Sequence, residues 1–181
     1  MEDVCSYRHV WAIDNFLRRW IHNPAKIYSP WLKPGMTVID IGCGGGFTAI
    51  GMARIVGDRG HVLCVDLQRE MLDIAKRKAD KAGLGDRIHT HQCTPDSLGV
   101  EESFDFANTF WMVHEVPDKP AFFRQVRACL KPGGRLFVAE PRMHVTRDAF
   151  EHMIETAAQA GLSLHARPPV RLSMAAVFSR E

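Results

Sequence analysis

The sequence predicts an α/β fold in which a doubly wound, mostly parallel sheet carries helices on both faces. Two observations support this prediction. Short apolar runs of strand length alternate along the chain with longer stretches of helical periodicity. An acid and three spaced glycines, in residues 40–46, separate the first apolar run from a helical stretch. Such a turn presents backbone amides to a ligand in α/β domains.

Each element follows from a local pattern. Apolar residues recur at helical spacing from Val10 to Ile21, and Asn23-Pro24 is an N-cap followed by the first residue of a short helix. Glycines stop further helices expected at residues 47–56, 70–82 and 148–160, and another helix is expected at residues 119–130. Strands are expected at residues 36–39, 61–66, 89–93, 104–110, 135–140, 162–166 and 174–178.

Composition and charge are those of an ordinary globular protein. With 181 residues, 46% of them hydrophobic and 24% charged, the chain fits one domain with a sizeable core. Its formal net charge of +2 at pH 7 favours neither nucleic acid nor an acidic membrane as a partner. No apolar stretch approaches the length of a membrane span, and the N-terminus lacks the apolar region of a signal peptide.

The cysteines indicate a reducing compartment. They number five and are scattered along the chain, so we expect free thiols in a cytoplasmic protein. No Cys-x-x-Cys pair is present, and we therefore expect no metal site. Both a monomer and a homodimer are compatible with these patterns.

The glycine-rich turn indicates the class of ligand. Its glycines allow positive φ angles and a close approach of the ligand to the backbone. A dinucleotide site has the pattern Gly-x-Gly-x-x-Gly, but here Phe47 takes the last position. Asp40 would also lie close to two phosphates, and like charges repel. A ligand with an ammonium group and no phosphate, such as S-adenosylmethionine, fits the turn better, and a nicotinamide oxidoreductase is disfavoured.

Four stretches in order resemble the class I (Rossmann-like) S-adenosylmethionine-dependent methyltransferases, in particular their small-molecule, type-11-like branch. They are the turn at residues 40–46, the strand ending in Asp66, the strand at residues 103–108, and the turn and strand at residues 130–138. The resemblance implies a seven-stranded sheet that ends in an antiparallel strand pair. It also implies S-adenosyl-L-methionine as the cofactor and S-adenosyl-L-homocysteine as the product.

The same resemblance implies a set of cofactor-binding residues. Asp40 would hold the amino end of the methionine moiety, directly or through water. Asp66 would accept hydrogen bonds from the two ribose hydroxyls, although it also suits an N-cap of the next helix. Leu67 would offer an apolar face to adenine. The complete set is Asp40, Gly42, Cys43, Gly44, Gly46, Asp66, Leu67, Cys93, Thr94, Pro95 and Asn108.

One position departs from the family pattern. Thr94 stands where many relatives carry an aspartate that accepts a hydrogen bond from the adenine amino group. The threonine hydroxyl or the neighbouring backbone can replace that acceptor. Asp96 is an alternative acceptor of that hydrogen bond. It is equally well interpreted as a solvent-exposed acid in a loop.

The acceptor side is expected at two clusters that follow strands. After residue 108 the chain does not continue as Asn-Pro-Pro-Tyr or Asp-Pro-Pro-Tyr, so methylation of exocyclic amines of bases is disfavoured. Imidazole titrates near neutral pH, which makes His114 and then His144 candidate general bases. Glu140 would orient the acceptor and Arg142 would bind an anionic substrate. A purely structural role is also possible for each of these four residues. Trp111 is expected either in the wall of the acceptor pocket or in the hydrophobic core.

We divide the chain into an N-terminal helical lid or cap, residues 1–32, and a methyltransferase core, residues 33–181. Trp20 would then close over the substrate, or its helix packs permanently on the sheet. The expected function is methyl transfer to oxygen, nitrogen or sulfur of a small molecule by in-line displacement. The alternative is a non-catalytic or partner-completed S-adenosylmethionine-binding module.

Overall fold

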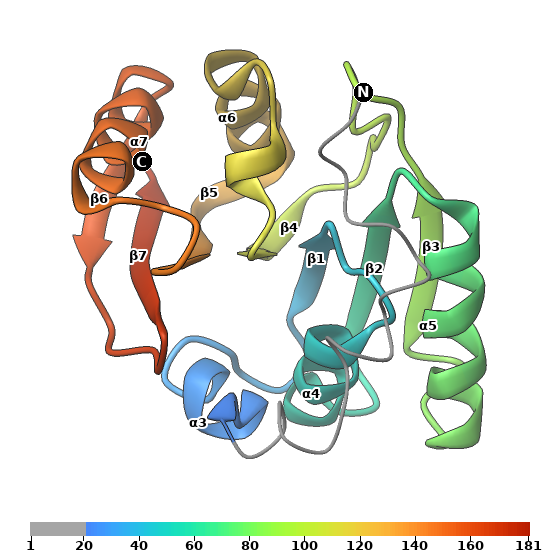
Figure 1. The fold of residues 1–181 in the computed structure, drawn as a ribbon. Coiled ribbons are helices and arrows are strands. Elements are labelled where there is room, and N and C mark those ends of the chain that lie inside the picture. Colours follow the sequence, from blue (N-terminus) through green and yellow to red (C-terminus); the bar gives the residue numbers. More distant parts are fainter. Residues whose placement is uncertain (1–20) are drawn as a thin grey trace. The chain divides into compact units, whose positions relative to one another are not determined.

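Seven strands form a mostly parallel sheet in the order β3-β2-β1-β4-β5-β7-β6, with an antiparallel pair at the C-terminal end of the chain. This confirms the predicted fold class. The computed structural model describes residues 21–181 (Figure 1). The chain forms two compact units, of which the first ends at Cys93 and the second begins at Thr94. Most of the predicted lid, including Trp20, lies outside the described residues.

The first unit alternates helices and parallel strands from the N-terminal side. Asn23 caps the first helix, because its side chain accepts from the amides of Ala25 and Lys26 at 3.0 and 3.4 Å. Helices α4 and α5 pack on the strands, whose register is parallel throughout (Figure 1). The elements are α3 (Pro24–Tyr28), β1 (Thr37–Ile41), α4 (Phe47–Val56), β2 (His61–Asp66), α5 (Arg69–Lys81) and β3 (Ile88–Gln92).

The second unit has two parallel strands followed by an antiparallel hairpin. Asp118 and Thr146 cap its two α-helices through bonds to the amides of Ala121 and Ala149. Phe123 and Phe178 pack ring against ring, with centroids 6.5 Å apart, in the buried interior. The elements are β4 (Phe104–Phe110), η2 (Val113–Glu115), α6 (Lys119–Cys129), β5 (Leu130–Pro141), α7 (Arg147–Gln159), β6 (Leu162–Ala166) and β7 (Ser173–Arg180).

Strand β5 begins at Leu130, five residues before the expected start at Arg135. The turn residues after Leu130, among them Gly133 with φ +75°, predict an interruption. Pairing nevertheless continues on both sides of them, because Leu130 pairs with Phe104 and the register shifts before the next pair. A bulge therefore absorbs the turn sequence within the strand.

None of the helices in residues 21–181 is long and apolar enough to cross a membrane.

Candidate active site

The glycine-rich turn follows β1 in the first unit and is anchored to β2. The amides of Gly42 and Cys43 donate to the Val65 carbonyl at 2.8 and 3.2 Å. Gly42, Gly44 and Gly46 all have positive φ, at 67°, 50° and 78°, which is the conformation that glycine adopts at least cost. A Cβ on Gly44 would meet nothing within 4 Å, whereas one on Gly46 would come within 2.9 Å of the Ala75 Cβ. The turn thus has an open side at Gly44 and a side packed on α5 at Gly46.

Asp66 ends β2 and holds this turn in place. Its carboxylate accepts from the Gly44 amide at 2.9 Å and from the Gln68 amide at 3.0 Å. Burial raises the pKa of Asp66, while the bonds from the backbone amides act in the opposite direction. The N-cap of α5 is Gln68, so Asp66 is not the cap of that helix; its carboxylate instead holds the connection before α5 and the glycine turn.

Asp40 lies at the end of β1 and is buried. Its carboxylate accepts from the Thr48 hydroxyl at 2.7 Å. Thr48 belongs to the first turn of α4, where the helix dipole favours a nearby negative charge. The fold thus offsets part of the cost of burying this carboxylate behind the glycine turn.

Three further predicted cofactor residues of the first unit surround the ends of β2 and β3. Leu67 is half-buried, and its carbonyl accepts from the Gln92 side chain at 3.0 Å. The Cys93 amide donates to the Asp66 carbonyl at 3.1 Å, and burial raises the pKa of the Cys93 thiol to about 11. A hydrogen bond with Cys64, burial and nearby carboxylates raise the pKa of Cys43 as well. Both thiols are therefore protonated at neutral pH, and neither is an activated nucleophile.

The predicted adenine-binding turn opens the second unit. The Thr94 amide donates to the Ser97 carbonyl at 3.0 Å, and the Ser97 amide donates to the Thr94 carbonyl at 3.3 Å. Thr94, Pro95 and Asp96 are exposed, and the Asp96 carbonyl accepts from the Gln125 side chain at 2.9 Å. The hydroxyl of Thr94 and the carboxylate of Asp96 both remain candidate acceptors for an adenine amino group.

The second unit also brings together the three predicted catalytic residues. Glu140, buried on β5, accepts from the Val113 amide at 2.9 Å, and its other carboxylate oxygen lies 2.5 Å from Nδ1 of His114. This bond, together with nearby negative charge, raises the pKa of His114, although burial acts against the increase. The ring of the exposed His144 meets that of His114 edge to face, with centroids 5.9 Å apart. His114 is thus the base candidate that a carboxylate orients.

Trp111 and Arg142, the predicted substrate-binding residues of this unit, meet at Ser173. Trp111 has φ +64°, rare for a residue other than glycine, and its indole Nε1 donates to the Ser173 hydroxyl at 2.9 Å. The Nε of Arg142 donates to the Ser173 carbonyl at 3.0 Å. Asn108, the remaining predicted cofactor residue, is fully buried on β4.

Ser173 and Glu115 are site residues that sequence reasoning missed. Ser173 is separated from Trp111 by 62 positions in the chain, so no local pattern connects them. Glu115 lies beside His114, and its Oε1 is 3.9 Å from Nε2 of that ring. The position of an acid next to a candidate base was the available signal for Glu115.

Comparisons with known proteins identify the family of the chain. Residues 32–167 match the family described as Methyltransferase domain. Over 109 residues the chain is 34% identical to the ubiquinone/menaquinone biosynthesis C-methyltransferase UbiE of Vibrio vulnificus, which covers 60% of this chain and 42% of that protein. The chain therefore spans less than half the length of this relative.

Solved structures share the fold. A SAM-dependent methyltransferase from Aquifex aeolicus aligns with a TM-score of 0.90 at 21% identity, over 98% of this chain and 100% of that one. The [4+2]-cyclase SpnF aligns with a TM-score of 0.73 at 19% identity, over 88% of this chain and 79% of that one. The name of the second shows that this fold alone does not specify the reaction.

The fold is that of class I S-adenosylmethionine-dependent methyltransferases. The chain belongs to the methyltransferase domain family. The glycine turn fits the cofactor of this class, because its backbone at Gly44 faces open space and the neighbouring Asp66 offers carboxylate oxygens at a strand end.

Proposed function

We propose that this protein transfers a methyl group to oxygen, nitrogen or sulfur of a small-molecule acceptor, with His114 as the general base. The observation that carries the proposal is the buried Glu140 bonded to Nδ1 of a half-buried His114. Bound S-adenosylmethionine supplies an electrophilic methyl group. The protein then has to position the acceptor and remove its proton.

The Glu140–His114 pair is suited to that proton transfer. When Nδ1 donates to Glu140, Nε2 carries the lone pair that takes the acceptor's proton. Glu115, at 3.9 Å from Nε2, and Glu140 both stabilise the imidazolium that results. His144 lies beside the ring and is the second candidate base.

The cofactor assignment remains part of the proposal. The residues around the first unit's turn would hold the methionine moiety, Asp66 the ribose, and Leu67 with the turn after Cys93 the adenine. The polar support that Asp40 and Asp66 give to this region supports the assignment. The proposed cofactor residues are Asp40, Gly42, Cys43, Gly44, Gly46, Asp66, Leu67, Cys93, Thr94, Pro95 and Asn108.

We also retain the proposed division into a lid, residues 1–32, and a core, residues 33–181. The family match supports it, because the matched region begins at residue 32. Trp20 belongs to the proposed lid.

A carbon acceptor is the second candidate. It is favoured by the name of the Vibrio vulnificus relative, a C-methyltransferase. The His114 base would then remove a proton from an acidic group of the acceptor and raise the electron density of the carbon that is methylated.

The first experiment is a calorimetric titration of the purified protein with S-adenosylhomocysteine, with NAD as the control ligand. We expect micromolar binding of the first and none of the second. Labelled methyl transfer to acceptors grouped by oxygen, nitrogen, sulfur and carbon then tests the reaction. His114→Ala should strongly reduce the rate of transfer, and His152→Ala, which changes an exposed histidine on α7, should not. Binding without transfer to any group would favour the non-catalytic or partner-completed module.

A further inference from the structure

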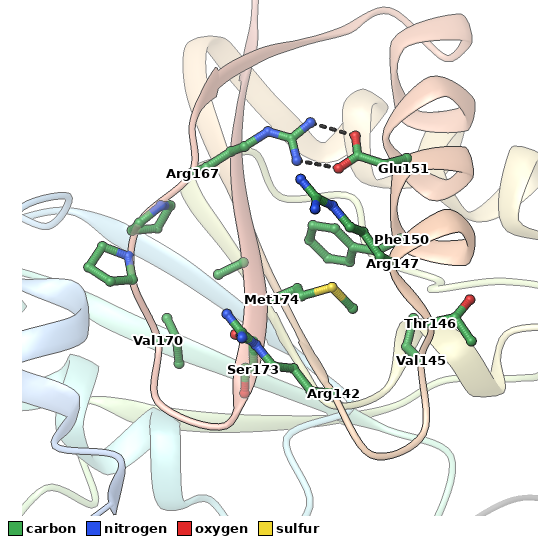
Figure 2. A pocket seen from close by; sticks show the side chains of 13 residues that line it. Arg142, Val145, Thr146, Arg147, Phe150, Glu151, Arg167, Val170, Ser173 and Met174 are labelled. Carbon is green, nitrogen blue, oxygen red and sulfur yellow. Dashed lines mark hydrogen bonds and ion pairs between the residues drawn. The ribbon is translucent and has the colours of Figure 1, made fainter.

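A pocket of about 630 Å³ lies within the second unit, at the first turns of α7 and beside β7 (Figure 2). The chain between β5 and α7 and the chain between β6 and β7 complete its walls. Its charged lining consists of three arginines and one glutamate, Arg142, Arg147, Arg167 and Glu151. The volume falls in the range of small-molecule sites, and the excess of positive charge favours an anionic ligand.

One of the arginines is already paired. Both terminal nitrogens of Arg167 bond to the two Glu151 oxygens at 2.6 Å, the pair that Figure 2 marks with dashed lines. Neither of the other two arginines bonds to a carboxylate of residues 21–181, although Arg147, after the bonded Arg167, also lowers the pKa of the Glu151 carboxyl. Two guanidinium groups therefore line this pocket without a carboxylate bonded to them there.

The placement of these two arginines is specific. Arg142 is held by the bond from its Nε to the Ser173 carbonyl, so its terminal nitrogens are pre-oriented for a second acceptor. Arg147 is the first residue of α7, where a cation opposes the helix dipole. A bound anion would offset that cost.

Between the charged groups the lining is apolar. Figure 2 shows Arg142 beside Ser173 at one end and Arg147 near the Arg167–Glu151 pair at the other, with Phe150 and Met174 between them. Val170 adds to this apolar wall and, like Phe150, is buried. A ligand that fills the pocket thus needs an anionic group and an apolar body.

The pocket is continuous in the chain with the proposed acceptor side. Glu140 immediately precedes Pro141 and Arg142, and His144 lies in the same connection. Ser173 bonds to Trp111 through its hydroxyl and to Arg142 through its carbonyl. The bond from Trp111 to Ser173 therefore ties the pocket wall to the segment that leads to His114, and the bond from Arg142 to Ser173 lies within the wall.

We propose that this pocket binds the carboxylate and apolar body of an amphipathic organic acid, which is the methyl acceptor, through Arg142 and Arg147. This rests on the proposed function, because it places the acceptor's nucleophile toward His114. It adds the substrate class, an organic acid of intermediate size that carries a second, methylatable group.

The test is direct binding to the full chain by calorimetry, with cinnamate and decanoate as probes and cinnamamide and inorganic phosphate as controls. We expect at least one carboxylate to bind. Cinnamamide and phosphate should bind at least tenfold more weakly, since the first lacks the charge and the second the apolar body. Arg142→Gln and Arg147→Gln should each weaken the carboxylate about tenfold.

Two further variants are controls for folding and charge. Arg124→Gln removes an exposed arginine of α6 outside the pocket and should leave binding unchanged. Arg142→Lys keeps the charge without the fork of donors, and should give an intermediate affinity if the folded structure is retained by circular dichroism.

The proposal is overturned if neither carboxylate binds, or if inorganic phosphate binds as tightly as the carboxylates. It is also overturned if Arg147→Gln and Arg124→Gln change the affinity for the carboxylate equally. The measurement needs neither methyl donor nor turnover. If no methyl transfer is found, the carboxylate-binding result still stands. If S-adenosylhomocysteine binds normally but no carboxylate does, only the pocket proposal is refuted, and the proposed function is not.

Discussion

The strand ends of the first unit differ in construction from those of the second. In the first, a short contiguous turn presents backbone, and its carboxylates Asp40 and Asp66 are partnered by nearby hydroxyl and amide groups. In the second, side chains from distant positions pair with one another, as Glu140 does with His114 and Trp111 with Ser173. Backbone donors suit one constant ligand, whereas interchangeable side chains suit an acceptor that varies between related enzymes.

The largest expected effect tests the second region. His114→Ala should lower the methyl-transfer rate by about 10²–10⁴-fold, the usual contribution of a general base. With an acceptor from the panel, the wild-type rate should rise with pH through the raised pKa of His114, because only the neutral ring accepts a proton. If His114→Ala has the wild-type rate and the wild-type dependence on pH, His114 is not the general base. Either His144 is then the base or the reaction needs none.

Protonation of His114 should also make the stability of the protein depend on pH. The folded pKa of His114 lies above its unfolded value, so its stabilising effect is complete below the unfolded pKa and is lost as pH rises through the folded one. The difference in unfolding free energy between wild type and His114→Ala should be larger at about pH 5.5 than at about pH 8.5, on either side of the ordinary value of about 6.5. Urea titrations at both pH values measure it.

The next effect tests the first region's turn. Gly46→Ala should lower the unfolding free energy by about 2–5 kcal/mol, because it adds the strain of φ +78° to a 2.9 Å approach to Ala75. Gly44→Ala is the matched control, with a positive φ but open space, and should cost only about 1–2 kcal/mol. Gly44→Val should instead abolish binding of S-adenosylhomocysteine. Equal stability of the two alanine variants, or normal binding by the valine variant, would contradict the two-sided description of the turn.

A smaller effect is expected at Asp66. Asp66→Ala should weaken S-adenosylhomocysteine binding by about 1–3 kcal/mol and lower stability by about 1–2 kcal/mol, because the Gly44 and Gln68 amides lose their acceptor. Since burial raises the pKa of Asp66, wild-type affinity should decline as pH falls through that raised value. Calorimetry and urea unfolding check both, with the exposed Asp73→Ala as control. Unchanged affinity would remove Asp66 from the cofactor site.

The smallest expected effect concerns the hydrogen bond between Trp111 and Ser173 in the second unit. Trp111→Phe and Ser173→Ala each remove the bond between indole and hydroxyl, and each should cost about 1–2 kcal/mol of stability. The double variant should cost clearly less than the sum of the two, because both changes remove the same interaction. Strict additivity in urea unfolding would show that the bond contributes nothing.

Local patterns determined the fold and the conformation of the glycine-rich turn. The alternation of strand and helix periods predicted the seven strands and the α-helices of the described residues, but not η2, since each pattern depends on neighbours in sequence. The expected start of β5 was late by five residues, because Pro132 and Gly133 favour a turn while long-range pairing with β4 keeps the strand. The turn contains four glycines, and the three that are spaced by one residue, Gly42, Gly44 and Gly46, adopt the positive φ angles that glycine permits.

Tertiary structure alone decided the side-chain pairs of the second unit. The sequence named His114, His144 and Glu140 as separate candidates, and only the fold brings Glu140 and His114 together across 26 positions. It likewise assembles the arginine pocket from two separate stretches of chain, residues 142–151 and 167–175. A contiguous turn is specified by its own residues, whereas contacts between distant residues depend on strand register and helix packing, which no short stretch of sequence contains.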